Sequence, residues 1–229
     1  SQYRDGYKAH IAVEPETGII TASTLTPANT ADGPVGVDLL EGEEPGLQVL
    51  ADSAYGSGPV RQDLKDARHT AVIKPIPLKR NHRLGKNQFS RDDFTIDYEA
   101  ETVTCPNNIT VTITASGTAT FGAKCRGCPI QQRCTSANRG RTFKVGDHDQ
   151  ILAQARAQWR AQDNLDDYRQ YRPMVERSIS WIVTNGHRRV RYRGVELNRA
   201  QLALRIAAIN LRRLVNLGLN HNGHAWAVT

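Results

Sequence analysis

The chain has 229 residues, of which 39% are hydrophobic and 23% charged, with a net charge of +7 and an isoelectric point near 9.4. This balance excludes an intrinsically disordered chain, and no run approaches the ~18–20 apolar residues of a membrane-spanning helix. The basic charge favours a polyanionic partner without identifying it.

The first part of the sequence predicts a β-hairpin followed by a short helix. Residues 7–13 and 19–25 are rich in β-branched and apolar side chains, as strands are. The five residues between them, EPETG, have a proline early and a glycine late, which is typical of a turn. A helix is predicted over residues 30–40, where Thr30 or Asp32 can cap it.

Two further strands and a helix are predicted next. Residues 47–51 and 71–74 are short apolar runs, and residues 59–68 form a helix between them that begins at a proline. An antiparallel hairpin followed by strand–helix–strand crossovers predicts a mixed sheet with helices on its faces. The expected fold class is therefore α/β, of the α+β mixed-sheet kind.

The composition divides the chain into four predicted segments. Residues 1–76 form the sheet portion. Residues 77–147 are polar, rich in Thr, Asn and Gly, and contain all four cysteines, so we expect an inserted module of short strands and loops. Residues 148–221 are helical in pattern, and residues 222–229 form a tail that is expected to be frayed.

Three helices are predicted in the C-terminal part, over residues 150–162, 173–184 and 199–217. The middle helix is expected to begin at Pro173, because the residue before a proline resists the α conformation. The last helix is expected to follow a capping box that starts at Asn198.

Asp52 is the first candidate functional residue. It follows the predicted strand 47–51 directly and precedes the loop SAYGSG, whose glycines allow a close approach of the backbone to a ligand. Ligands of open α/β sheets gather at the carboxyl ends of strands, where a carboxylate can hold a metal ion or a proton. The alternative is a purely structural role, in which the Asp52 side chain caps the following turn.

Glu176 is the second candidate. It lies in the first turns of the predicted helix, at the margin of an apolar stripe formed by Val175, Ile179 and Ile182. A carboxylate there can point into a cleft, with Arg172 one turn earlier to steady it. The alternative is a surface glutamate that the helix dipole favours.

The cysteines follow a spacing of C-x19-C-x2-C-x5-C. Four thiolates that include a C-x2-C pair suit tetrahedral Zn²⁺, which would organise a module too poor in large apolar residues to fold well alone. A closed shell of four cysteines leaves no position for catalysis. The alternatives are free buried thiols, a site reduced to three ligands, or His148 as a substitute ligand. The predicted structural zinc ligands are Cys105, Cys125, Cys128 and Cys134.

Basic side chains crowd the stretch from residue 187 to 213, in which Glu196 is the only acid. Arginine forks match phosphate oxygens, so this stretch predicts contact with a nucleic-acid backbone. The apolar side of the last helix, with Leu202, Ile206 and Ile209, is expected to be core instead. The predicted DNA contacts are Arg172, Arg188, Arg189, Arg191 and Arg193.

Seven sequence pieces, spread over nearly the whole chain, together carry a family resemblance. They are GYKAHIAVEPETGIITA (6–22), LTPANTADG (25–33), LADSAYGSG (50–58), VIKP (72–75), YRQYRPMVERSIS (168–180), RYRG (191–194) and NLRRLVNLGL (210–219). Through these pieces, in this order, residues 7–219 resemble the C-terminal part of the catalytic domain of bacterial insertion-sequence transposases of the DDE class.

The resemblance implies a ribonuclease-H-like sheet that presents two aspartates and a glutamate to divalent cations. Asp52 then corresponds to the second aspartate and Glu176 to the glutamate, and both would bind Mg²⁺ or Mn²⁺. Metal-dependent cleavage and strand transfer of DNA would follow, since two cations ~3.5–4 Å apart stabilise the attacking and leaving oxygens. The resemblance also implies insertion-sequence ends and target DNA as partners, a homodimer, no membrane association, and a cytoplasmic, nucleoid-associated location.

The chain departs from the family pattern in three places. Tyr168 stands one position earlier than the usual tyrosine, and Val183 occupies a position where many members have lysine. The family's first aspartate, which belongs to the first and central strand, has no counterpart apart from Asp5, whose context does not match. The only methionine is Met174, so we expect the chain to be a fragment. Because it is short of one catalytic carboxylate and of the first, central strand of a ribonuclease-H-like core, we expect that it cannot run the reaction alone.

Two other functions remain open from the sequence. One is a catalytically dead, DNA-binding remnant of a transposase that keeps the basic helices and the cysteine module. The other is a zinc-stabilised interaction module unrelated to DNA, against which the joint occurrence of LADSAYGSG and RPMVERSIS argues.

Overall fold

The computed structural model describes residues 6–79, 85, 87–184 and 188–228. The fold combines helices with small sheets, in agreement with the predicted α+β class, and it divides into two compact units. The first unit comprises residues 1–74 and 159–229, and the second comprises residues 75–158. The first unit contains strands β1 (Tyr7–Val13), β2 (Ile20–Pro27), β3 (Gln48–Ala51), β4 (Thr70–Ile73), β10 (Leu219–His221) and β11 (Trp226–Val228), the 3₁₀ turn η1 (Ser53–Tyr55), and helices α1 (Asp32–Asp38), α2 (Gly58–Asp66), α5 (Leu165–Val183) and α6 (Val195–Asn216).

Strands β1 and β2 form the predicted antiparallel hairpin. The turn is held by the Glu14 carboxylate, which accepts hydrogen bonds from the backbone N–H groups of Glu16 (2.9 Å) and Thr17 (2.7 Å). Gly18 closes the turn at φ +74°, a backbone conformation that glycine adopts without strain. Local turn chemistry therefore determines this hairpin, as the sequence predicted.

Strands β3 and β4 pair in parallel through helix α2, which confirms the predicted crossover. Helix α2 has a proline in its first turn and buries Val60 and Leu64 against Ile73 of β4. Arg61 of the same helix is buried and donates a 2.7 Å hydrogen bond to the Ile73 carbonyl. Helix α2 is thereby attached to the carboxyl end of β4.

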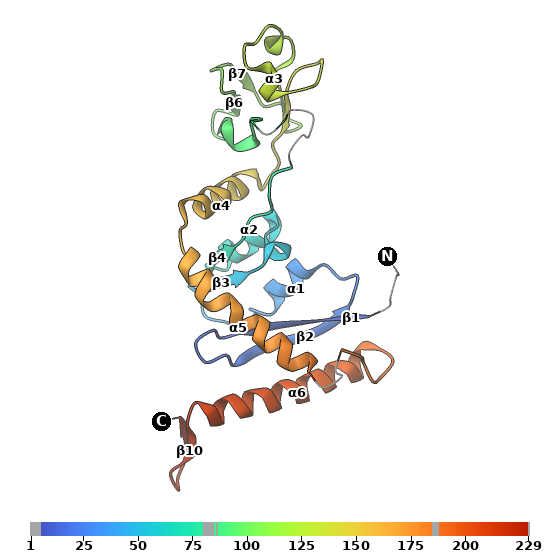
Figure 1. Ribbon diagram of the computed structural model, residues 1–229, viewed down its shortest axis with the longest axis vertical. Coiled ribbons are helices and arrows are strands. Elements are labelled where there is room, and N and C mark those ends of the chain that lie inside the picture. Colours follow the sequence, from blue (N-terminus) through green and yellow to red (C-terminus); the bar gives the residue numbers. More distant parts are fainter. Residues whose placement is uncertain (1–5, 80–84, 86, 185–187, 229) are drawn as a thin grey trace. The chain divides into compact units, whose positions relative to one another are not determined.

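The hairpin and the parallel pair remain two separate sheets among the described residues, whereas the sequence predicted one mixed sheet. Helix α6 packs on β2, and α5 contacts both β1 and β3 (Figure 1). The predicted apolar side of α6 is indeed core: Leu202, Ile206 and Ile209 are buried together with Ile20 and Leu25 of the hairpin.

Two predicted helix starts are wrong. Helix α5 begins at Leu165, after Asn164 in the left-handed conformation, and continues through Pro173. Helix α6 begins at Val195, so Asn198 lies inside it. The Asn198 amide donates to the carbonyls of Tyr192 (2.8 Å) and Gly194 (2.7 Å), and thus holds the preceding loop instead of starting the helix.

The tail also differs from the prediction, because β10 and β11 pair as a short antiparallel hairpin. The side chains of Asn220 and Asn222 accept hydrogen bonds from nearby backbone N–H groups, at 2.8 to 3.0 Å. Local polar bonding of this kind favours a turn over an unstructured end.

The second unit is built on three-residue strands around aromatic side chains. Phe94, Phe121 and Phe143 are buried, and the ring centroids of Phe94 and Phe143 lie 4.3 Å apart. The elements are β5 (Thr95–Asp97), β6 (Thr102–Thr104) and β7 (Thr110–Thr112) in one sheet, β8 (Thr118–Thr120) and β9 (Thr142–Lys144) in another, the 3₁₀ turns η3 (Arg91–Asp93) and η4 (Gly122–Cys125), and the helices α3 (Gln131–Cys134) and α4 (Asp149–Ala161), of which α4 begins in this unit.

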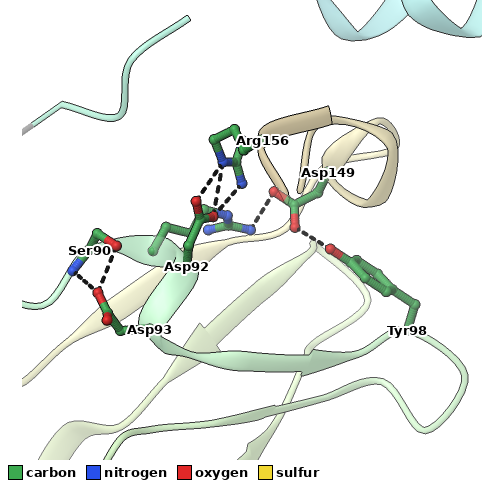
Figure 2. A network of polar contacts seen from close by, with 7 residues as sticks. Ser90, Asp92, Asp93, Tyr98, Asp149 and Arg156 are labelled. Carbon is green, nitrogen blue, oxygen red and sulfur yellow. Dashed lines mark hydrogen bonds and ion pairs between the residues drawn. The ribbon is translucent and has the colours of Figure 1, made fainter. Parts of the chain in front are cut away.

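Polar contacts attach the start of α4 to this unit (Figure 2). Asp149 accepts a 2.9 Å hydrogen bond from the Tyr98 hydroxyl and pairs with Arg91 at 2.6 Å. Two turns further along α4, Arg156 pairs with Asp92 at 2.8 Å. All four charged side chains of these pairs are less than a fifth exposed, so the pairs are shielded from screening by water and salt.

Candidate active site

Asp52 lies at the carboxyl end of β3, directly before the turn η1. One of its carboxylate oxygens, Oδ1, accepts a 2.8 Å hydrogen bond from the Ala54 N–H and so caps the turn. The side chain remains 51% exposed, which leaves the other oxygen, Oδ2, available to a ligand. The capping role considered for Asp52 is therefore present, and it leaves the second oxygen exposed.

Glu176 lies on α5, and Arg172 one turn earlier connects it with Asp52. The Arg172 guanidinium is 3.9 Å from Asp52 Oδ2 and 3.6 Å from Glu176 Oε1. The Arg172 side chain is 19% exposed and that of Glu176 is 71% exposed, so the cation is sheltered while the carboxylate faces solvent. Two carboxylates that are 124 positions apart in the sequence thus share one cation.

A large cavity of about 400 Å³ adjoins Asp52 and Arg172. Residues of β1, β3, α1 and α5 line it, and Asp52 and Arg172 belong to its wall. Val175 and Ile179 also line it, and Ile179 is 44% exposed, so the predicted apolar stripe of α5 is fully buried only at Ile182. The apolar wall of α5 faces an open space beside the acidic pair.

His10 and Tyr55 lie in the wall of the same cavity and were not among the predicted site residues. His10 Nε2 is 2.9 Å from Thr26 Oγ1, and its Nδ1 is 3.5 Å from the Tyr55 hydroxyl. Burial lowers the pKa of His10, with Asp32 opposing and Lys8 adding to the shift. Burial, then Asp32 and Asp52, raise the pKa of Tyr55. The sequence did hold a signal for Tyr55, because this residue lies within LADSAYGSG and follows Asp52 by three residues.

Asp52 and Glu176 are chemically suited to Mg²⁺ or Mn²⁺. Hard carboxylate oxygens are the ligands that these cations prefer, and Mg²⁺ needs only one or two protein carboxylates because it keeps several waters. Among the residues that the structure describes, no three His, Cys, Asp or Glu side chains form a group that could hold a metal ion. The donor set present is therefore a pair, and Asp5 lies outside the described residues.

The other predicted DNA contacts occupy the loop before α6. Arg188, Arg189, Arg191 and Arg193 are all exposed. The positive charge of Arg191 contributes, after burial, to a lowered pKa of Arg205 on α6, so the loop and the helix place cations near one another. This loop presents a basic surface that no acidic partner among the described residues is seen to neutralise.

The four cysteines all border a second, much smaller cavity in the other unit, and all are free thiols.

A family model described as a transposase DDE domain matches residues 1–211 of the chain. The chain belongs to the DDE transposase family. Comparisons with curated proteins and with solved structures find no match. Family membership makes this a transposase domain of the nuclease class, with DNA as its partner. No described helix of this DDE domain is long and apolar enough to cross a membrane.

Proposed function

We propose that this chain forms the catalytic core of a transposase that cleaves insertion-sequence ends and transfers the strands in a metal-dependent reaction. The observation that carries the proposal is the convergence of Asp52 and Glu176 on Arg172. These are the two residues that the family resemblance assigns to catalysis, and nothing in their local sequence requires them to meet.

Asp52 and Glu176 would hold Mg²⁺ or Mn²⁺, and the bound cations would stabilise the attacking and leaving oxygens of the phosphodiester. Arg172 keeps the two carboxylates close despite their mutual repulsion, because it lies between them and is itself largely sheltered. Its Nη1 is buried, lies 3.6 Å from Glu176 Oε1 and makes no hydrogen bond with the described residues, so its charge acts on Glu176.

The third carboxylate would come from a strand placed in the cavity between β1 and β3. Among the described residues β1 pairs only with β2, and β3 pairs only with β4. Residues of both strands line the cavity, so each has an edge available there for main-chain hydrogen bonds. A strand antiparallel to β1 and parallel to β3 would join the two small sheets into the mixed sheet of a ribonuclease-H-like fold. The apolar side chains of Val175 and Ile179 would cover it.

The exposed arginines before α6 would contact the DNA backbone. Arg188, Arg189, Arg191 and Arg193 are free of acidic neighbours within the described loop, and phosphate contacts position a protein without selecting sequence. Binding through these residues should weaken steeply as salt concentration rises.

Nicking of supercoiled plasmid in Mg²⁺ or Mn²⁺ tests the proposal. The 229-residue chain would be assayed alone and joined to a segment that supplies the added strand with its carboxylate, each form also as Asp52→Asn and Glu176→Gln. Asp63→Asn, an exposed carboxylate on α2, is the matched control. We expect nicking by the form with the added strand and by its Asp63→Asn variant, and loss of at least 100-fold in the two site variants.

Two results would contradict the proposal. If nicking by the form with the added strand survives both Asp52→Asn and Glu176→Gln, the active site lies elsewhere. Nicking by the 229-residue chain that disappears in Asp52→Asn would show that the site needs no third carboxylate from an added strand.

A further inference from the structure

All four cysteines of the chain border one small cavity in the second unit. They come from three separate places in the sequence: Cys105 follows β6, Cys125 and Cys128 flank the end of η4, and Cys134 ends α3. The cavity measures about 20 Å³. That is about the volume for a single water-sized particle, and hence for a single ion.

The segment from Cys125 to Cys128 forms a tight turn that is closed by its own backbone. The Cys128 N–H donates a 3.3 Å hydrogen bond to the Cys125 carbonyl, and Gly127 between them has φ +71°. The Arg141 N–H donates to Cys125 Sγ at 3.4 Å, and such donors stabilise a thiolate. A Cβ on Gly140 would lie 3.2 Å from the same sulfur and 2.5 Å from the Gly122 carbonyl oxygen, so the backbone approaches closely there.

A second turn presents Cys105 to the same cavity. The Asn108 N–H donates a 2.9 Å hydrogen bond to the Cys105 carbonyl, and Asn108 adopts φ +56°. The Cys105 N–H in turn donates to the Ile109 carbonyl at 2.9 Å. Two turns, each closed by its own backbone hydrogen bonds, thus hold three of the sulfurs, and the end of α3 holds the fourth.

The core of the second unit is small enough to require a metal, and basic side chains near the cysteines would balance the charge of the metal's ligands. The strands of this unit are only three residues long, and the buried cluster includes two of the cysteines themselves, Cys125 and Cys134. Modules with so small a core usually require a metal or disulfides, and these thiols are free. Lys124 and Arg141 line the cavity, where they would offset the net negative charge of four thiolates around one divalent cation.

We propose that Cys105, Cys125, Cys128 and Cys134 bind one structural Zn²⁺. No three of these side chains already form a metal-holding group in the described structure, so the sulfurs must turn inwards as the ion binds. Binding is then coupled to the final packing of this unit. A shell of four sulfurs leaves no open position, so the ion stabilises the module and takes no part in cleavage.

Metal analysis of the purified 229-residue chain tests the proposal. We expect about one zinc per chain, falling below about a tenth in the double variant Cys125→Ser, Cys128→Ser, because two of four ligands are lost. Asp52→Asn with Glu176→Gln is the control: it should leave the zinc content unchanged. If the zinc content of this control is unchanged, zinc binding does not depend on Asp52 or Glu176. The zinc proposal can then stand or fail independently of the plasmid assay.

A second measurement covers the case in which the cysteine variant fails to fold. Unsubstituted protein loaded with Co²⁺ should show the visible absorption of a tetrahedral thiolate site. Its thiols should react slowly with a disulfide reagent until a chelator is added. Protein that contains no zinc, gives no tetrahedral cobalt spectrum, and has four freely reactive or disulfide-bonded cysteines would overturn the proposal.

Discussion

Arg213 of α6 is expected to be the most destabilising single position to alter in the first unit. The side chain is 6% exposed and donates to the Gly18 carbonyl and, at 3.0 Å, to Ser178 Oγ. It also lies 5.0 Å from the centre of the Trp181 ring. Arg213 thus connects α6 with the hairpin turn and with α5, the helix that carries Glu176.

The cost of Arg213→Met follows from these contacts. Each hydrogen bond from a charged donor contributes about 1.5–3 kcal/mol, and two such bonds would be lost. Removing a buried cation that has no carboxylate partner among the described residues returns part of this loss. Burial already lowers the pKa of Arg213, with Arg177 adding to the shift. The net expectation is a loss of about 2–4 kcal/mol in the free energy of unfolding.

Tryptophan fluorescence can follow this unit alone, because all three tryptophans lie in it. A loss of about 2–4 kcal/mol corresponds to a fall of about 5–15 °C in melting temperature for a domain of this size. The matched control is Arg212→Met, the exposed neighbour, which should change stability by less than about 0.5 kcal/mol. If Arg213→Met melts within about 2 °C of the control, the buried hydrogen bonds contribute little and the reasoning is wrong.

Three further predictions concern groups whose surroundings are unusual. The lowered pKa of His10 means that the folded state prefers the neutral ring, so stability is complete above pH 6.5 and falls as pH drops through that value. Melting curves between pH 7.5 and 5 should show this loss, and His10→Gln should reduce it. Burial, the hydrogen bond to Asp149 and its charge raise the pKa of Tyr98 to about 12, so the stability it contributes is lost as pH rises from about 10 to about 12. Absorbance titration should show a tyrosine ionising near pH 12, and that step should be missing in Tyr98→Phe. Phe143→Ala should destabilise the second unit by about 3–5 kcal/mol, measured by limited proteolysis, and a loss no larger than that of the less buried Phe89→Ala would contradict the packing argument.

The elements of the first 75 residues could be predicted because their signals are local. Turn residues between 14 and 18, the proline at the start of α2 and the β-branched and apolar composition of the strands all act within a few residues of chain. The partition of these strands into separate sheets could not be predicted in that way. Sheet assembly depends on which strands are present to pair. Strands β1 and β3 do not pair with each other and both line the cavity, and no local sequence signal predicts this.

The two wrong helix starts have a tertiary cause. A proline inside a helix loses one backbone hydrogen bond, yet α5 continues through Pro173 because its flanks are held elsewhere. Tyr168 packs edge-on against Trp159 before the proline, and Arg213 of α6 donates to Ser178 Oγ after it. Propensity at a single residue cannot outweigh contacts of this kind, which only the folded chain reveals.

Asp52 shows why the two interpretations of a site residue need not compete. Capping the turn uses Oδ1 and orients the carboxylate, so that Oδ2 is directed towards Arg172 instead of rotating freely. An uncapped loop aspartate would lose rotamer freedom when it binds a cation, and that loss would weaken binding. The Asp52 side chain is already ordered by the cap in the folded chain, so binding a cation costs it less entropy. Asp52→Asn keeps the amide oxygen for the cap but removes the charge, so it separates the two roles: the fold should persist and cation binding should be lost. A variant that unfolded instead would mean that the charge, through Arg172, is needed to hold α5 on β3.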